Sequence, residues 1–147
     1  MTLYSFLLHL HSGFRYIVLL LVLLAIIRAW LGWLGKVAYS ESHRKLNLFA
    51  MISVHTQLLI GIVLYFVSPF VKFGSDTMKD ATTRYWTVEH LTGMLIAIAL
   101  ITIGHARSKR GATSDAKHKS IAIFYTLALI VIAIIIIFSK RGLFGMS

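Results

Sequence analysis

Five histidines lie within or beside long apolar segments of this sequence: His9, His11, His55, His90 and His105. A neutral imidazole can ligate a metal ion or carry a proton through its two ring nitrogens. Ionisable side chains are costly in apolar surroundings, so they are functional candidates by default. A single histidine is more often explained by a hydrogen bond to a neighbouring helix or by an interfacial position. Five of them in three segments favour a role in chemistry.

His11 and His90 match in depth when each is counted from the nearest downstream arginine. His11 lies 17 residues before Arg28, and His90 lies 17 residues before Arg107, which is ~25 Å along a helix in each case. The two segments run in the same direction, and in a simple bundle they face each other diagonally. Two imidazoles at one depth suit the axial positions of a b-type haem. We predict that His11 and His90 hold one haem, with His9 as the alternative ligand on a different helix face.

His55 and His105 are the candidates for a second pair. His55 lies ten residues after Lys45, ~15 Å along a helix, whereas His105 lies two residues before Arg107, ~3 Å away. Helix tilts of roughly 20° are usual in membranes, and Arg107 can extend towards the interface, so the two histidines can reach one level. The alternative is that His105 is an interface residue. The number of haem groups is therefore one or two.

Three other polar residues belong to the same segments. Arg15 lies one turn after His11 on the same face, where it can pair with a haem propionate or extend to lipid head groups. Glu89, beside His90, either carries protons for a quinone or pairs with Arg84 at the interface. Gln57 is expected to form a hydrogen bond between helices.

The small, aromatic and loop residues give weaker signals. Glycines in the apolar segments can make room for a porphyrin face, but they also serve ordinary helix packing. Tyr85 and Trp86, near a predicted helix end, are typical of an aromatic belt. His43 and His118 have basic neighbours in predicted loops and are expected to be solvated. The glycines concerned are Gly13, Gly61, Gly93 and Gly104.

Four apolar blocks must position these side chains. They cover about residues 7–34, 46–71, 86–106 and 121–138 of a 147-residue chain that is 58% hydrophobic. Runs of about 18 or more apolar residues are typical of membrane-spanning helices, and a helix satisfies its own backbone groups there. We predict an all-α membrane protein, a single domain over residues 1–147, folded as a four-helix up-down-up-down bundle. The first block lacks the basic start of a signal peptide, so we expect it to be retained.

The net charge of +10 is concentrated in two of the three connections. Lysine and arginine in short loops mark the cytoplasmic side of a membrane protein, so we place the first and third connections in the cytoplasm and both termini outside. This placement favours anionic membrane lipid over nucleic acid as the partner of the basic residues. They are Arg28, Lys36, Arg44 and Lys45 in the first connection and Arg107, Lys109, Arg110, Lys117 and Lys119 in the third.

Three stretches resemble small bacterial membrane b-type cytochromes: LHLHSGFRYIVLL, SVHTQLLIGIVLYF and VEHLTGMLIAIALITIGHARSKR. The last is similar to the paired-histidine helix of the cytochrome b-561 group, and the second to a helix of haem A synthase. Length and pattern are also similar to short Bacteroidota proteins labelled cytochrome b. The resemblance implies that His11, His55, His90 and His105 are axial ligands. This sequence departs from the pattern of that family in two ways. Its fourth apolar block has no histidine, and 15 residues separate His90 from His105.

The resemblance implies electron transfer through haem b in the bacterial inner membrane, with both termini periplasmic. The implied partners are a membrane quinone or other respiratory-complex subunits. The absence of cysteine excludes disulfides and covalent haem attachment. Two other classes stay open: a non-haem structural subunit of a respiratory complex, and a small proton-coupled carrier that uses Glu89 and the histidines. No serine–histidine–aspartate set, phosphate loop or di-iron motif supports a hydrolase or a di-iron enzyme.

Overall fold

The structure, a computed structural model, describes residues 2–138 and consists of helices joined by short connections. The predicted all-α class is confirmed, because four helices are long and apolar enough to cross a membrane. The third of these is continuous from Ala81 to Arg110 but contains a π-helical turn. The elements are α1 (Leu3–Leu34), α2 (Glu41–Val67), α3 (Ala81–Arg84), η1 (Tyr85–Glu89), α4 (His90–Arg110) and α5 (Ser114–Phe138).

The helices extend beyond their apolar blocks because polar side chains cap their first turns. Thr2 accepts a hydrogen bond from the Ser5 amide ahead of α1, and Ser40 and His43 cap each other's backbone at the start of α2. Asp80 accepts hydrogen bonds from the Thr83 hydroxyl and amide ahead of α3, which hold the pKa of Asp80 below its ordinary value. The Thr113 hydroxyl accepts a hydrogen bond from the Ala116 amide ahead of α5, and the predicted polar loop between the last two long helices is reduced to residues 111–113.

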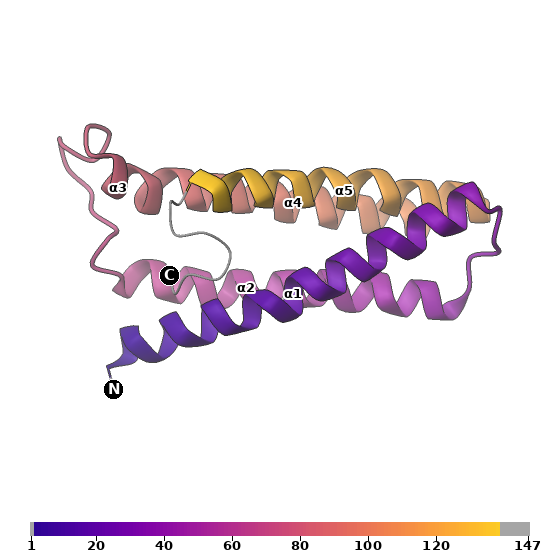
Figure 1. Cartoon of the computed structure of the whole chain (residues 1–147), viewed down its shortest axis with the longest axis horizontal. Helices are drawn as coiled ribbons and strands as arrows, with labels where there is room; N and C mark the ends of the chain where they lie inside the picture. Colours follow the sequence, from indigo (N-terminus) through magenta and orange to yellow (C-terminus); the bar gives the residue numbers. More distant parts are fainter. Residues whose placement is uncertain (1, 139–147) are drawn as a thin grey trace.

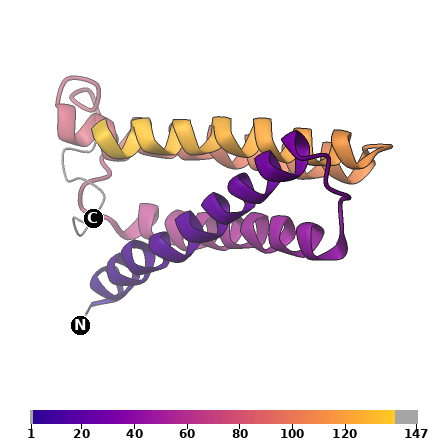
Figure 2. The ribbon, with the colours of Figure 1, turned by 45° about the vertical axis from the view of Figure 1, so that its right-hand side comes forward.

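The four long helices form an antiparallel bundle in which α1 and α4 lie on a diagonal (Figure 1). Helix α1 packs against α2 and α5, and α4 packs against the same two helices. Helix α1 also crosses the bundle obliquely, so that its first half follows α2 and its last turns reach α5 (Figures 1 and 2). The bundle is consequently splayed at one end and closed at the other.

The two ends of the bundle differ in charge as well as in packing. We call the closed end, which holds the connections at residues 35–40 and 111–113, the basic end. The splayed end, which holds the start of α1 and residues 68–80, is the cavity end. Six alanines in the core let the helices approach closely because their side chains are small, and none of the six exposes more than 3% of its surface. They are Ala25, Ala29, Ala50, Ala97, Ala122 and Ala128.

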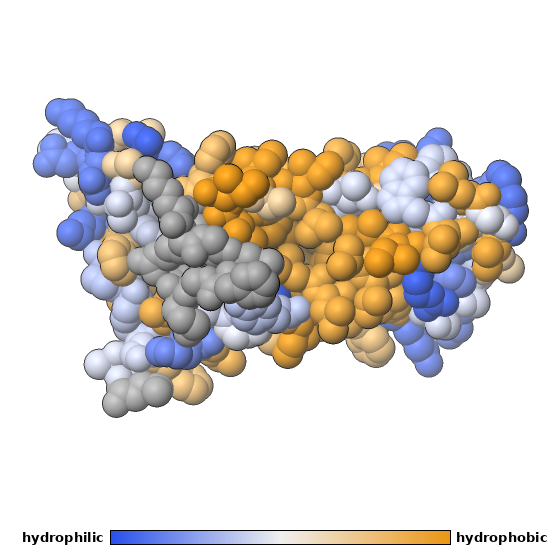
Figure 3. Space-filling view, in the orientation of Figure 1, coloured by the Kyte–Doolittle hydropathy of each residue, from blue (hydrophilic) through white to orange (hydrophobic). Residues whose placement is uncertain are grey.

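The outer surface between the two ends is apolar. Large side chains such as Leu20, Leu59 and Ile96 are 50–66% exposed, and a hydrophobic band separates polar groups at the two ends (Figure 3). A water-soluble protein rarely exposes an apolar surface of this extent. The fold is that of a multi-pass membrane protein with lipid-facing helices.

Candidate functional site

A cavity of about 160 Å³ lies inside the cavity end and is lined by all four long helices. Its walls are mostly apolar, with side chains such as Leu19, Met94 and Ile132. Its polar lining includes both His11 and His90. Small-molecule sites are usually about 300–1,000 Å³, so a macrocycle requires some lining side chains to move aside. Met94 has an unbranched, flexible side chain suited to that.

His11 and His90 face each other across this cavity from the diagonal helices α1 and α4. Their ring centroids are 6.3 Å apart, and their ring planes are inclined by 71°. A bond between a metal and an imidazole nitrogen is about 2.0–2.1 Å long, so two rings that ligate one metal from opposite sides have centroids roughly 6 Å apart. The equal depth predicted from the sequence thus corresponds to a separation that one metal can bridge.

The π-helical turn η1 sets the surroundings of His90. Its extra residue brings positions i and i+5 together, so the hydroxyl oxygen of Tyr85 lies 3.4 Å from His90 Nδ1. The Tyr85 hydroxyl donates to the carbonyl oxygen of Ile135, at 2.9 Å, and so offers a lone pair to an Nδ1–H group. That tautomer leaves Nε2 of His90 without a proton, which is the state a metal ligand needs.

His11 is held by α2. The Gln57 amide donates to the carbonyl oxygen of His11, at 2.8 Å, which is the predicted hydrogen bond between helices. Gly61 allows the ring to approach, because a Cβ atom on Gly61 would lie only 3.1 Å from Cε1 of His11. Gly93 and Gly104 instead serve helix packing, since a Cβ atom there would lie 2.4 Å from Ile135 and Phe124 respectively.

His11 Nδ1 and Gln57 Oε1 are among the polar atoms of this site that are buried without a hydrogen-bond partner. Buried polar atoms are normally satisfied, so such atoms point to a missing ligand or water. Within residues 2–138, no three or more histidine, cysteine or acidic side chains gather as a site for a metal ion. A haem iron needs only two axial protein ligands, because the porphyrin supplies the others. The residues of the cavity fit that group better than they fit a bare metal ion.

The charged residues near the cavity occupy two different settings. Arg15 lines the cavity, and its guanidinium lies 5.1 Å from the ring centroid of Tyr16. Glu89 forms an ion pair with Arg84, with 2.6 Å between Nε and Oε1. Of the two roles predicted for Glu89, this pairing is the interfacial one. Arg15 also donates a hydrogen bond to the Tyr16 hydroxyl, at 3.3 Å, and it places a cation in the lining of the cavity.

The remaining predicted histidines lie away from the facing pair. His55 Nε2 is 2.8 Å from the Thr102 hydroxyl, which itself donates to the Ile98 carbonyl, so His55 links α2 to α4 as a donor. His105 is half-buried, and its Nδ1 has no hydrogen-bond partner. His9 is exposed, and its Nδ1 donates to the Ser5 carbonyl one turn earlier. The ligand roles of these three histidines stay predictions.

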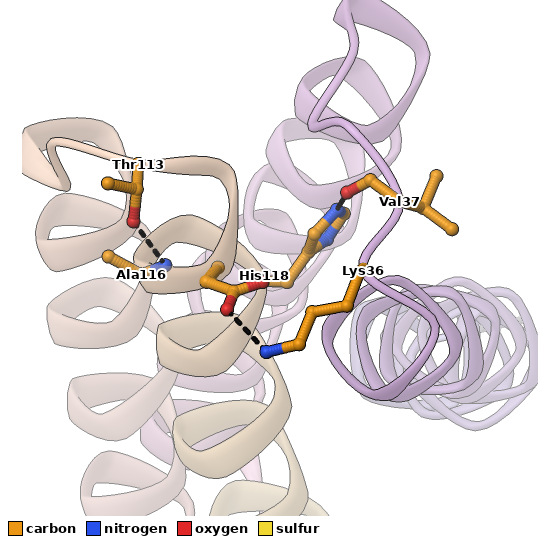
Figure 4. A network of polar contacts seen from close by, with 6 residues as sticks. Lys36, Val37, Thr113, Ala116 and His118 are labelled. Atoms are coloured by element: carbon orange, nitrogen blue, oxygen red, sulfur yellow. Dashed lines mark hydrogen bonds and ion pairs between the residues drawn. The ribbon is translucent and has the colours of Figure 1, made fainter.

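The prediction that His43 and His118 are solvated is wrong. His43 is 9% exposed and His118 only 1% exposed, and their rings are in contact at the basic end, with centroids 4.7 Å apart. His118 donates from Nε2 to the Val37 carbonyl oxygen, at 3.0 Å (Figure 4), and packs against Gly32. Capping extends α2 and α5 past the apolar blocks, and this places both histidines inside the bundle.

Tyr85 is a site residue that sequence reasoning assigned to an aromatic belt. It is 6% exposed and faces the cavity. Residues five positions apart do not face each other on an α-helix, so no periodic signal connects Tyr85 with His90. Only the π-helical turn brings them together, and such turns are frequent at functional sites.

No protein family, curated protein or solved structure gives a significant match to this chain.

Proposed function

We propose that this chain is a membrane haem b protein that transfers electrons. The observation that carries the proposal is the facing pair His11 and His90, drawn from diagonal helices across an apolar cavity. The resemblance of the histidine-bearing segments to b-type cytochromes supports it. A haem iron, when bound, supplies one-electron redox chemistry.

The residues of the cavity have separate tasks in this proposal. His11 and His90 bind the iron, and Arg15 pairs with a propionate. The apolar walls exclude water, and burial of this kind is one determinant of reduction potential. The electron partners that suit a membrane site are a quinone or another respiratory-complex subunit.

The test is an optical spectrum of the intact protein, purified in detergent after expression with ample haem. We expect a Soret band, a low-spin reduced-minus-oxidised spectrum, and pigment that acidified acetone extracts, because the chain has no cysteine to anchor haem. A folded, colourless protein would overturn the proposal. It would favour the structural subunit, or a proton-coupled carrier if proton uptake accompanied transport.

His55 and His105 remain the proposed ligands of a second haem. Replacing His105 with alanine distinguishes the two stoichiometries. A two-haem protein should lose about half of its pigment per chain, whereas a one-haem protein built on His11 and His90 should lose almost none. The hydrogen bond from His55 to Thr102 favours the single haem. The pyridine haemochrome content per mole of protein gives the answer.

We propose that the basic end faces the cytoplasm of a bacterial inner membrane and that both termini are periplasmic. The natural absence of cysteine makes labelling simple. Cysteines that replace the exposed residues Ala38 and Ala112 should be shielded from an impermeant thiol reagent in intact cells. A cysteine that replaces Ser75, in the connection at the cavity end, should be labelled. The reverse pattern would invert the orientation.

A further inference from the structure

A second cavity, about 500 Å³, lies at the basic end between the last turn of α4 and the first turns of α5. Its rim carries the cationic side chains of Arg107 and Arg110 from α4 and Lys119 from α5. Ile123 and Phe124 form its apolar side. The cavity thus combines three positive charges with an apolar wall. We call it the α4–α5 groove.

Within residues 2–138, the cations of the α4–α5 groove form no ion pair with an acidic side chain. The chain has only five acidic residues, and the basic end holds two of them. Glu41 pairs with Arg44 on α2. Asp115 pairs with Lys36, at 2.8 Å. The groove therefore concentrates positive charge that an external anion can neutralise.

The ring contacts of these cations leave their charge in place. The Arg107 guanidinium lies 5.7 Å from the ring centroid of Phe124, and the Lys119 amine lies 5.8 Å from the Trp33 ring. Contacts with aromatic rings orient a cation without compensating its charge. Arg107 and Arg110 are three residues apart, so they share one face of α4. Two guanidinium groups on one face suit the oxygens of a phosphate group.

The surface next to the groove is apolar towards the middle of the membrane. Ile103, one turn before Arg107 on α4, is 48% exposed, and Leu127, one turn after Ile123 on α5, is 45% exposed. Phosphate contacts at the end of a helix pair, above an exposed apolar track, match the two parts of a phospholipid. Basic pockets between membrane helices are known to bind anionic head groups.

We propose that the α4–α5 groove binds the phosphate of an anionic phospholipid, whose acyl chains lie along Ile103 and Leu127. Arg107, Arg110 and Lys119 contact the phosphate oxygens, and Ile123 and Phe124 contact the start of the acyl chains. This site is separate from the cavity of His11 and His90 and does not depend on haem. It anchors α4 to α5 at the lipid surface.

The experiment compares lipid retention by the detergent-purified protein in native mass spectrometry. The probe is an equimolar mixture of phosphatidylglycerol and phosphatidylcholine. We expect the unmodified protein to retain phosphatidylglycerol selectively. The Arg107→Gln, Arg110→Gln double variant should lose about tenfold or more of that retention, since each cation near a lipid surface contributes about 1 kcal/mol, and phosphatidylcholine adducts should stay constant.

The matched control is the Lys45→Gln, Lys109→Gln double variant, which removes the same charge from the same end but no residue of the groove lining. It should retain phosphatidylglycerol like the unmodified protein. Equal losses in both double variants, or no loss in either, would overturn the site. If the arginine variant does not fold, Lys119→Glu replaces it, with the same expected loss.

The source of the phosphate is tested separately by thermal unfolding in detergent. Phosphatidylglycerol should raise the unfolding temperature of the unmodified protein more than that of the arginine variant. Inorganic phosphate at the same concentration should produce no such difference. An equal effect of inorganic phosphate alone would overturn the assignment to a lipid.

Discussion

The two ends of the bundle each bring two histidines into contact range, but with different surroundings. At the basic end, His43 and His118 lie in a close-packed core, where the Ser40 amide and hydroxyl contact His43 and the Val37 carbonyl contacts His118. At the cavity end, His11 and His90 line an open cavity. The first pair is fully packed and hydrogen-bonded within the fold, whereas the second pair borders space that a ligand can fill.

The difference shows that the distance between two rings does not by itself identify a ligand site. The rings of His43 and His118 are the closer pair, at 4.7 Å against 6.3 Å. Yet their separation leaves no room for an atom between them, because ring contact already fills it. A pair whose ring centroids have the spacing that one shared metal would require, beside buried atoms without partners, is the arrangement that suits ligation.

The largest effect that distinguishes the two ends is expected from alanine substitution of one histidine in each pair. His90→Ala removes one of the two proposed haem ligands, so haem should be lost or become high-spin. His118→Ala should keep the low-spin spectrum of bound haem but lower the free energy of unfolding by about 2–4 kcal/mol, because it removes buried packing and a hydrogen bond. Optical spectra and thermal unfolding in detergent measure the two quantities.

His11→Ala provides the second half of this test. It should resemble His90→Ala in the spectrum, since the proposal needs both histidines for low-spin iron. Full low-spin haem in both variants would remove the facing pair as the ligand set, and His9, His55 and His105 would be the next candidates.

The fold and the facing pair followed from sequence because both depend on regular helices. The four apolar blocks predict the four helices, and an equal residue count from Arg28 and Arg107 predicts the shared depth of His11 and His90. Helix periodicity carries this information without any knowledge of side-chain contacts.

The packed histidines and the Tyr85 contact could not be predicted in that way. Residues 114–120 are mostly polar, so their hydropathy predicts exposure. Only the contacts of His118 with Gly32 and Val37 reveal that this one side chain is buried. Tyr85 reaches His90 through a π-helical turn, which has no reliable sequence signal. Both depend on contacts between segments rather than on local pattern.

A smaller effect is expected from adding one methyl group beside a histidine at each end. A Cβ atom on Gly32 would lie 2.5 Å from His118, so Gly32→Ala should cost about 1–3 kcal/mol through overpacking without changing the spectrum. A Cβ atom on Gly61 would lie 3.1 Å from His11. Gly61→Ala should therefore shift the ring slightly, weaken the low-spin signal and leave stability nearly unchanged.

Gly13→Ala is the control for both glycine variants, because a Cβ atom there meets nothing within 4 Å. It should leave the spectrum unaltered and raise helix stability by about 0.5–1 kcal/mol. A spectral change in Gly32→Ala, or a large loss of stability in Gly61→Ala, would contradict the assignment of separate roles to the two ends.

The smallest effect is expected from Tyr85→Phe, which removes a single oxygen beside His90. An acceptor at Nδ1–H makes the imidazole more basic and stabilises ferric iron. Its removal should therefore raise the midpoint potential of the haem. It should weaken haem affinity by about tenfold or less, given the long 3.4 Å contact.

Tyr65→Phe is the matched control. Tyr65 also lines the cavity and donates one hydrogen bond to a carbonyl, that of Thr87, but its ring packs against Phe66 and Phe73. A redox titration of both variants should show a shift for Tyr85→Phe alone. Equal shifts would mean that Tyr85 acts through the helix backbone and not through His90.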